Sequence, residues 1–205
     1  MAKPRLVQTD LPEEILEDFL RRDELALDCE MMGLNPHRDR LCVLQIMAEQ
    51  GPIALMQINE QLEYPNLRRV LESTEIEKIF HFARMDCLFL LKRLGIRVNK
   101  VFCTKIASKL ARTYTDRHGL KELAREICGV TMDKTNQSSD WGREKLTDDQ
   151  LYYAEGDIKY LFTIKSTLIE MLKREDRYEL ALDTLACLPN RIELDARGFG
   201  EVFEH

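Results

Sequence analysis

The sequence lacks any run of about 18 apolar residues, the length that a membrane-spanning helix needs. Its amino-terminal segment also lacks the apolar core of a signal peptide. We therefore expect a cytoplasmic protein that does not contact a membrane. The 205 residues contain no repeat, low-complexity run or Gly/Ser-rich linker, and only six prolines are spread along them. A single domain of this length is expected, with two small domains as the less favoured division.

Cysteine pairs at metal-binding spacing are also absent. The six cysteines lie at positions 29, 42, 87, 103, 128 and 187, and no two of them form a C-x-x-C pair. In a long chain without a secretion signal, we expect reduced and mostly buried thiols. A zinc site is therefore not expected.

Positive charge is in deficit. The chain has 30 Lys and Arg against 36 Asp and Glu, which gives a net charge of −6 and a pI of about 5.4. Proteins that bind long nucleic acids through many phosphates need a broad basic surface, so that class of function is disfavoured. An enzyme that acts on short oligonucleotides stays open, because bound divalent cations would cancel acidic charges and attract phosphate locally.

The hydrophobic fraction of 44% is ample for a core, and its pattern changes along the chain. Strands are expected over 24–29, 41–48, 52–58 and 78–81. Helices are expected over 12–22, 65–73, 84–94, 103–112, 118–128 and 147–173. Gly95 ends the third of these helices, and a capping box at Thr147–Gln150 opens the last. Strands early and helices late predict an α/β sheet flanked by helices.

Four carboxylates lie in or beside apolar segments that should be buried. Asp28 and Glu30 share a predicted strand at spacing i, i+2, so their side chains leave the same face. Asp86 lies near the start of a predicted helix, and Asp157 lies four residues after Tyr153 on another. A buried, unpaired carboxylate is costly, and convergence of all four acids on divalent metal ions would explain them together.

The individual patterns are weak. In either D-x-E or Y-x-x-x-D alone, a carboxylate is more often solvated or capping than part of a site. Together, acids from three elements could hold two hard cations of the kind that promote in-line phosphodiester displacement. Tyr153 would then position or deprotonate a water.

The ordered set Asp28-x-Glu30, His81-x4-Asp86 and Tyr153-x3-Asp157 resembles the DEDD 3′–5′ exonucleases, in the tyrosine-bearing subgroup that includes ribonuclease D. Segments 104–108, 112–121 and 137–141, followed by 146–147 and 150–151, also resemble ribonuclease D. Segment 33–42 and the short length are similar to the nanoRNase C group of diribonucleotidases. The resemblance covers most of the chain from about residue 25. Cys29 departs from it, since a threonine is common between the two acids.

The resemblance implies an RNase H-like fold with a mixed sheet, two Mg²⁺ or Mn²⁺ ions, and hydrolysis of nucleic acid from the 3′ end to 5′-mononucleotides. It makes Asp28, Glu30, Asp86 and Asp157 the metal ligands and Tyr153 the residue that orients water. We expect no helical nucleic-acid-binding domain after the catalytic one, whereas ribonuclease D has such a domain. With the acidic pI, this favours very short RNA, chiefly dinucleotides, as the substrate.

Candidate substrate contacts lie outside the acids. Leu34 is either a wedge between two bases, as in related oligoribonucleases, or an ordinary core leucine. His81 is either a strand-end residue with a satisfied ring or a substrate contact. A basic and aromatic cluster is either a solvated helix face or a clamp for a 5′ phosphate, and it comprises Arg112, Tyr114, Arg117, His118 and Lys121.

A polar segment is expected to border the site, and it contains Gln137, Ser138, Ser139 and Trp141. For Trp141, packing of its ring in the core is the favoured interpretation. Residues 1–187 are taken as the exonuclease domain. Residues 188–205 show little periodicity, and we expect a tail that docks on a neighbouring subunit, since nanoRNase C-like proteins are expected to form rings of eight.

Two alternatives to the diribonucleotidase stay open. One is a broader ribonuclease D-like exonuclease that acts on longer RNA or single-stranded DNA. The other is a catalytically silent domain that binds RNA or a protein, although acids at every motif position argue against it.

Overall fold

The computed structural model describes residues 4–132 and 139–202. In these residues the strands are β1 (Arg5–Val7), β2 (Glu24–Met31), β3 (Leu41–Ala48), β4 (Ile53–Gln57), β5 (Glu77–Phe80) and β6 (Val101–Cys103). The helices are α1 (Glu13–Leu20), α2 (Pro65–Leu71), α3 (Ala83–Leu94), α4 (Thr104–Ala111), α5 (Leu120–Cys128), α6 (Asp148–Lys159), α7 (Leu161–Arg174), α8 (Tyr178–Ala186) and α9 (Leu188–Ala196).

The strands form one mixed sheet of six in the order β1-β4-β3-β2-β5-β6. β3 runs antiparallel to both of its neighbours, β2 and β4, whereas the other neighbouring pairs are parallel. Every residue of β3 is buried, including a glutamine, Gln45. The predicted α/β fold with a mixed sheet flanked by helices is therefore confirmed.

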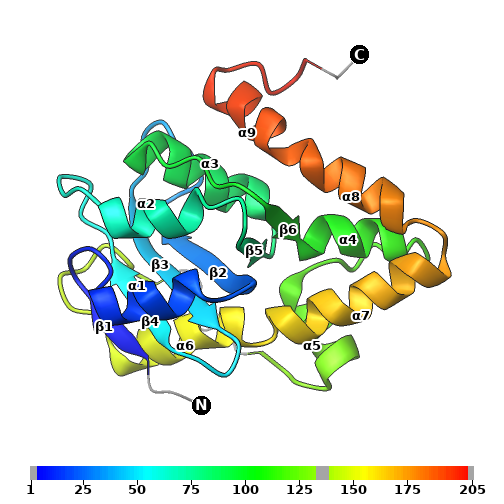
Figure 1. The fold of residues 1–205 in the computed structure, drawn as a ribbon, viewed down its shortest axis with the longest axis horizontal. Helices are drawn as coiled ribbons and strands as arrows, with labels where there is room; N and C mark the ends of the chain where they lie inside the picture. The colour runs from blue at the N-terminus through cyan, green and yellow to red at the C-terminus, as the bar shows by residue number, and fades with distance from the viewer. Residues whose placement is uncertain (1–3, 133–138, 203–205) are drawn as a thin grey trace.

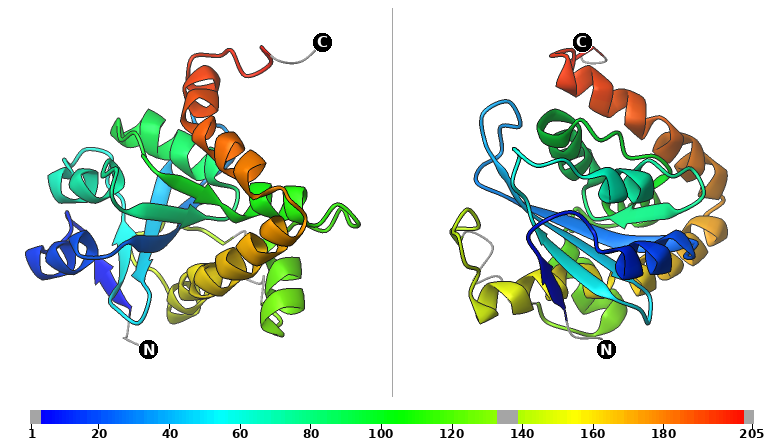
Figure 2. Two further views of the ribbon diagram at one scale, coloured as in Figure 1. Left: turned by 45° about the vertical axis from the view of Figure 1, so that its right-hand side comes forward. Right: turned by 60° about the vertical axis from the view of Figure 1, so that its left-hand side comes forward.

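Helices cover both faces of this sheet (Figures 1 and 2). On one face α3 contacts β3, β5 and β6, and on the other α6 contacts β2, β3 and β4. α7 continues from α6 and packs chiefly against α4. No helix within 4–132 or 139–202 has both the length and the apolar character to cross a bilayer.

Most predicted elements are present, with shifts of a few residues at their ends. The helix predicted over 147–173 is instead two helices, because the chain turns at Tyr160, where α6 ends and α7 begins. Each half packs on a different partner, α6 on the sheet and α7 on α4. The short strands β1 and β6 and the helix α8 were not predicted from the sequence.

The segment after residue 187 is not an irregular tail. Residues 188–196 form α9, which packs against α3 and buries Leu188 and Ile192. The Arg84 guanidinium donates two hydrogen bonds to Asp195, from Nε at 2.5 Å and from Nη2 at 2.8 Å. The apolar residues of α9 therefore pack within the chain, and docking of residues 188–205 on a neighbouring subunit stays a prediction.

The amino-terminal end of α6 is closed by the predicted capping box. Thr147 Oγ1 accepts from the Gln150 backbone N–H at 3.2 Å, and Gln150 Oε1 accepts from the Thr147 backbone N–H at 3.0 Å. These bonds satisfy donors that a helix start otherwise leaves open. Since α6 carries Tyr153 and Asp157, the capping box also fixes the helix backbone from which these two side chains project.

Replacement of Thr147 by alanine should lower the free energy of unfolding by about 1 kcal/mol, because the cap is lost. Chemical denaturation would measure this change. Thr163→Ala is the matched control, since Thr163 is exposed within α7 and alanine favours a helix there. Equal stability of the Thr147→Ala variant and the unchanged protein would contradict a stabilising role for the cap.

Candidate active site

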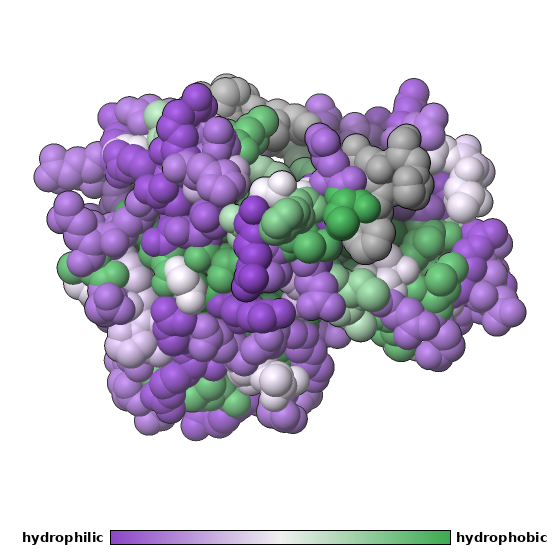
Figure 3. Space-filling model, turned by 90° about the horizontal axis from the view of Figure 1, so that it is seen from above, coloured by the Kyte–Doolittle hydropathy of each residue, from purple (hydrophilic) through white to green (hydrophobic). Residues whose placement is uncertain are grey.

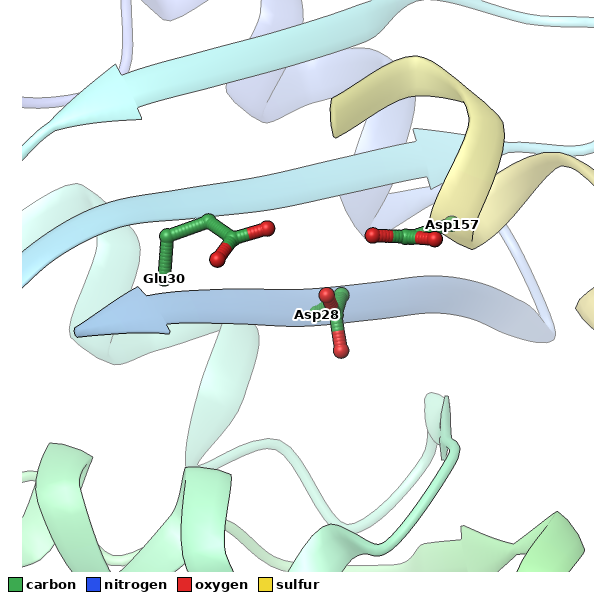
Figure 4. A group of neighbouring side chains, drawn as sticks. All are labelled: Asp28, Glu30 and Asp157. Carbon is green, nitrogen blue, oxygen red and sulfur yellow. The ribbon is translucent and has the colours of Figure 1, made fainter. Parts of the chain in front are cut away.

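Three of the four predicted acids meet at one point. Asp28 and Glu30 leave the same face of β2, and Asp157 comes from α6, which covers that face. One carboxylate oxygen from each lies within 4.8 Å of the other two. Figure 4 shows the three side chains pointing toward one another between the strand and the helix. The alternation of side chains along β2 therefore produces the pairing that the D-x-E spacing predicts.

Asp86 reaches the same cavity from α3, although it lies outside the group of three. Its carboxylate accepts hydrogen bonds from the backbone N–H and the thiol of Cys29. Cys29 lies between Asp28 and Glu30 and faces the other side of β2. Cys29 thus holds Asp86 at the cavity that the other three acids line, and the thiol takes a role that a threonine hydroxyl could also fill.

The carboxylates raise one another's pKa values. Burial, followed by the charges of Asp86, Asp157 and Glu30, raises the pKa of Asp28 well above its ordinary value. Burial and the charges of Asp157 and Asp86 raise the pKa of Glu30 to about 9. Burial also raises the pKa of Asp86 to about 8. A set of buried oxygen donors that repel one another is suited to a hard divalent cation.

Tyr153 lies beside this group on α6. Its hydroxyl donates a hydrogen bond to Asp157, and burial together with the nearby acids raises the pKa of the phenol. The ring packs against Trp141 with 5.9 Å between ring centroids and 50° between planes. Trp141 itself is 1% exposed, so its predicted core packing is confirmed.

The segment that carries Trp141 is tied to α6 by Gln150. The Gln150 Nε2 group donates to Ser139 Oγ and to the Asp140 carbonyl, both at 3.0 Å. Ser139 lines the cavity, as predicted for the polar segment. Gln137 and Ser138, the other two predicted contacts of this segment, lie outside the described residues.

The acids open into a cavity of about 630 Å³. Among the residues that line it, besides the four acids, are Leu34, His81, Phe82, Lys105, Lys121, Ser139 and Tyr153. The two lysines are the cations among the lining residues described by the structure, so four carboxylates face two ammonium groups. The volume is in the range of roughly 300–1,000 Å³ that is typical of small-ligand pockets.

Leu34 lies at the cavity with 81% of its surface exposed, so the interpretation as a core leucine is wrong. Its loop is closed by Asp39, whose carboxylate accepts from the Asn35 backbone N–H at 2.9 Å and from Arg38 Nε at 2.6 Å. Gly33 has φ +134°, and a Cβ there would lie 2.1 Å from Asp39 Oδ2. The loop therefore needs glycine at 33 to present Leu34.

His81 follows β5 directly and combines both predicted features. Its Nδ1 lies 2.9 Å from Thr104 Oγ1, and its ring also lines the cavity.

Phe82 has φ +67°, a left-handed backbone conformation that is unusual for a residue other than glycine, and its side chain is 42% exposed. Lys105 Nζ lies 3.9 Å from the centre of the Phe82 ring. Neither Phe82 nor Lys105 was predicted, although both lie in segments with family resemblance.

The basic and aromatic cluster is arranged differently from the predicted clamp. Arg112 is 1% exposed, and its guanidinium pairs with Glu126 and donates to the Arg117 carbonyl at 2.9 Å. His118 Nδ1 lies 2.9 Å from Ser108 Oγ. Arg112, Tyr114, Arg117 and His118 do not line the cavity, whereas Lys121 does. The predicted clamp is wrong for Arg112, because its charge is used inside the fold.

A family model described as 3′–5′ exonuclease matches residues 6–173. Ribonuclease D of Gluconacetobacter diazotrophicus is 27% identical over 174 residues, which are 85% of this chain and 44% of the relative. The mouse exosome complex component 10 is 28% identical over 173 residues, which are 84% of this chain and 19% of the relative. The chain thus spans less than half the length of these curated relatives.

Solved structures match over the whole length. Brucella melitensis NrnC with bound Mg²⁺ is 43% identical with a TM-score of 0.91, and the match covers 100% of both chains. NrnC of the same organism bound to pGG is 45% identical with a TM-score of 0.92, again over 100% of both chains. Escherichia coli RNase D shares the fold, with a TM-score of 0.80 at 22% identity over 93% of this chain and 51% of that one.

The raised carboxyl pKa values predict how stability changes with pH. The folded protein keeps protons on Asp86 and Glu30 up to about pH 8 and 9, whereas the unfolded chain releases them near pH 4. This contribution to stability is fully present below about pH 4 and is lost as the pH rises through 8 to 9. In EDTA, the melting temperature should therefore fall between pH 6 and pH 9.

Mg²⁺ should make that decline shallower, because a cation stabilises the ionised acids. The Glu30→Gln variant should also show a shallower decline, since one of the two groups no longer titrates. Thermal unfolding at pH 6, 7, 8 and 9 measures both effects. A wild-type slope equal to that of Glu30→Gln would show that Glu30 does not carry the linkage.

Proposed function

The chain belongs to the 3′–5′ exonuclease family whose model spans residues 6–173, and we propose that it is a metal-dependent 3′–5′ exoribonuclease. Its substrates are short RNAs, with dinucleotides preferred, and its products are 5′-mononucleotides. The observation that carries the proposal is the meeting of Asp28, Glu30 and Asp157 beside Tyr153 at the base of a cavity. The full-length relative NrnC, which has been seen with pGG, supports the choice of short substrates.

The residues fit divalent cations. All four acids offer hard oxygen ligands. Burial, followed by the neighbouring negative charges, raises the pKa of Asp28 and Glu30, and burial raises the pKa of Asp86, so the positive charge of a cation would favour their ionised forms. Asp28, Glu30 and Asp157 would hold one ion, and Asp86 would join them in holding a second. Bound Mg²⁺ or Mn²⁺ would supply Lewis-acid stabilisation of the oxygens in a phosphodiester displacement. The related NrnC structure that contains Mg²⁺ supports this choice of metal.

Tyr153 acts as a hydrogen-bonding group in this proposal. Its raised pKa keeps the phenol protonated at neutral pH, so it orients a water without taking the proton from it. Its hydroxyl is directed by Asp157, and its ring is held by Trp141. This favours the positioning role over the role as a base, both of which the sequence left open.

The cavity rim supplies the substrate contacts. Leu34 projects from its loop and would wedge between two bases, while Phe82 offers an aromatic face nearby on the lining. Lys105 and Lys121 would pair with phosphate oxygens, in place of the predicted Arg112 clamp. His81 would contact the substrate from the strand end. In this arrangement, selectivity for short RNA arises from lining residues and not from a broad basic surface.

A broader activity on longer RNA or single-stranded DNA is the second candidate. The curated relatives are named ribonuclease D, which favours it. A cavity that is open at one end would admit a longer strand, whereas a capped cavity would not. The two candidates share the acids and differ in how the end of the substrate opposite the scissile bond is held.

We also propose that the chain forms a homo-oligomer, with a ring of eight as the expected form. Exposed apolar side chains on α8 and after α9 support an interface there, since Leu180 is 56% exposed and Phe199 is 59% exposed. Figure 3 shows apolar surface within the mostly hydrophilic face seen from above. Light scattering would measure the assembly. A monomer in solution would contradict the proposal, and Leu180→Glu should reduce the assembled mass if α8 lies at the interface.

The experiment that tests the function is hydrolysis of 5′-labelled RNAs of two, three, five and twenty nucleotides, with Mg²⁺, with Mn²⁺ and with EDTA. We expect rapid cleavage of the dinucleotide and little cleavage of the longer RNAs. Stepwise shortening of every length would favour the broader exonuclease. No cleavage of any RNA in either metal would leave a silent binding domain.

The control is Asp157→Asn, which removes a proposed metal-ligand charge with little change of shape. Its rate should fall at least about 10²-fold while the melting temperature stays near that of the unchanged protein, since a single catalytic group commonly contributes that much. Retained activity would contradict the assignment of Asp157.

The Leu34→Ala variant should lose preference for the dinucleotide, because the wedge is removed.

A further inference from the structure

Gln45 is a buried amide with no visible purpose in the core. It lies in the middle of β3 with 0% of its surface exposed. Neither Nε2 nor Oε1 has a hydrogen-bond partner among the described residues. The other residues of β3 are apolar, so an aliphatic side chain would suit the position if packing were its only role.

The register of the sheet places Gln45 beside the acids. In the antiparallel pairing of β2 with β3, Gln45 lies directly opposite Asp28. Residues that are opposite each other in such a pair project to the same face, with Cβ atoms about 4.5–5.5 Å apart. Its partner on the other side, in β4, is Leu55, which has no polar side-chain atom. Asp28 is therefore the polar cross-strand neighbour of Gln45.

Helix α6 covers this part of the sheet. It contacts β2, β3 and β4, and it buries Ala154 and Ile158 as well as Asp157. Gln45 is thus enclosed in the layer on which the acid cluster rests, without access to solvent. A buried amide without hydrogen-bond partners is costly, and native cores keep few such groups.

We propose that Gln45 is a positioning residue for the metal site, and that its Nε2–H group donates to the Asp28 carboxylate when a divalent cation is bound. The amide then fixes the orientation in which Asp28 presents an oxygen to the cation. The inference rests on the metal site of the proposed function. It adds a residue from β3, a strand that contributes none of the four acids.

Chemistry favours this assignment. A carboxylate has two oxygens and about four acceptor positions, so an outer amide can bond to it while it also binds a metal. Hydrogen bonds to a carboxylate are stronger than those between neutral groups, so Asp28 is a favourable acceptor for the amide. Outer partners of metal ligands commonly change metal affinity by 10- to 100-fold.

The test is Gln45→Met, which keeps the length and volume of the side chain and removes both polar atoms. Isothermal titration of the full chain with MgCl₂ or MnCl₂ alone, without RNA, should show at least about tenfold weaker binding. The melting temperature in EDTA should stay equal or rise, because an unpaired buried amide has been removed. If Gln45 only filled space, Gln45→Met would bind the metal as tightly as the unchanged protein, and its melting temperature would still stay equal or rise.

Leu55→Met is the matched control. Leu55 is buried on the next strand opposite Gln45, so this change perturbs the same layer without touching a polar group. It should lower the melting temperature slightly and leave metal affinity unchanged. A loss of metal affinity equal to that of Gln45→Met would mean that any disturbance of the layer weakens the site, and the assignment of Gln45 would be overturned.

Failure of the inference and failure of the proposed function give different results. If the wild-type chain binds Mg²⁺ and Gln45→Met binds it equally well, Gln45 is not a positioning residue, and the metal site stands. If the wild-type chain binds neither ion, or if Asp157→Asn binds as tightly as wild type, the metal site itself is wrong. The inference about Gln45 then falls with it.

Discussion

Repulsion among buried carboxylates is the constraint on which the rest of this structure depends. One carboxylate oxygen from each of Asp28, Glu30 and Asp157 lies within 4.8 Å of the other two, and Asp86 lines the same cavity. Burial in a low-dielectric core makes each negative charge costly, so without a cation Glu30 and Asp86 keep their protons up to about pH 9 and pH 8. Because close, buried carboxylates are unfavourable in the metal-free protein, a divalent cation is the natural counter-charge. Binding of the ion is therefore linked to the stability of the fold.

The surrounding residues fix the position of α6 at its amino-terminal end. Thr147 and Gln150 close its first turn, and the same Gln150 side chain holds the segment with Ser139 and Asp140. Trp141 then packs on the Tyr153 ring. Asp39 also closes the loop of Leu34 against a glycine that no other residue could replace without a clash. The chemistry and the substrate-facing side chains are therefore held by separate and local hydrogen-bond networks.

The sequence predicts features that depend on local pattern. Strand β3, the capping box and the side-by-side placement of Asp28 and Glu30 follow from periodicity and spacing alone. It does not predict features that depend on distant partners. In the sequence, Arg112 has the pattern of a surface cation, but in the structure Glu126, fourteen residues later, pairs with it inside the fold. The break at Tyr160 follows from the separate partners of α6 and α7, and α9 becomes a helix against α3 with little periodicity of its own. In the sequence Gln45 is one polar residue within a strand, and its position opposite Asp28 becomes evident only from the register of the sheet.

More than half of the chain separates Asp28 on β2 from Asp157 on α6. Bringing such distant segments together costs conformational entropy, and this cost is offset only when the sheet and the helix dock. During synthesis the ribosome releases β2 long before α6, so a nascent chain carries two of the clustered acids without the third. The acid cluster of the proposed nuclease is therefore complete only in the finished molecule.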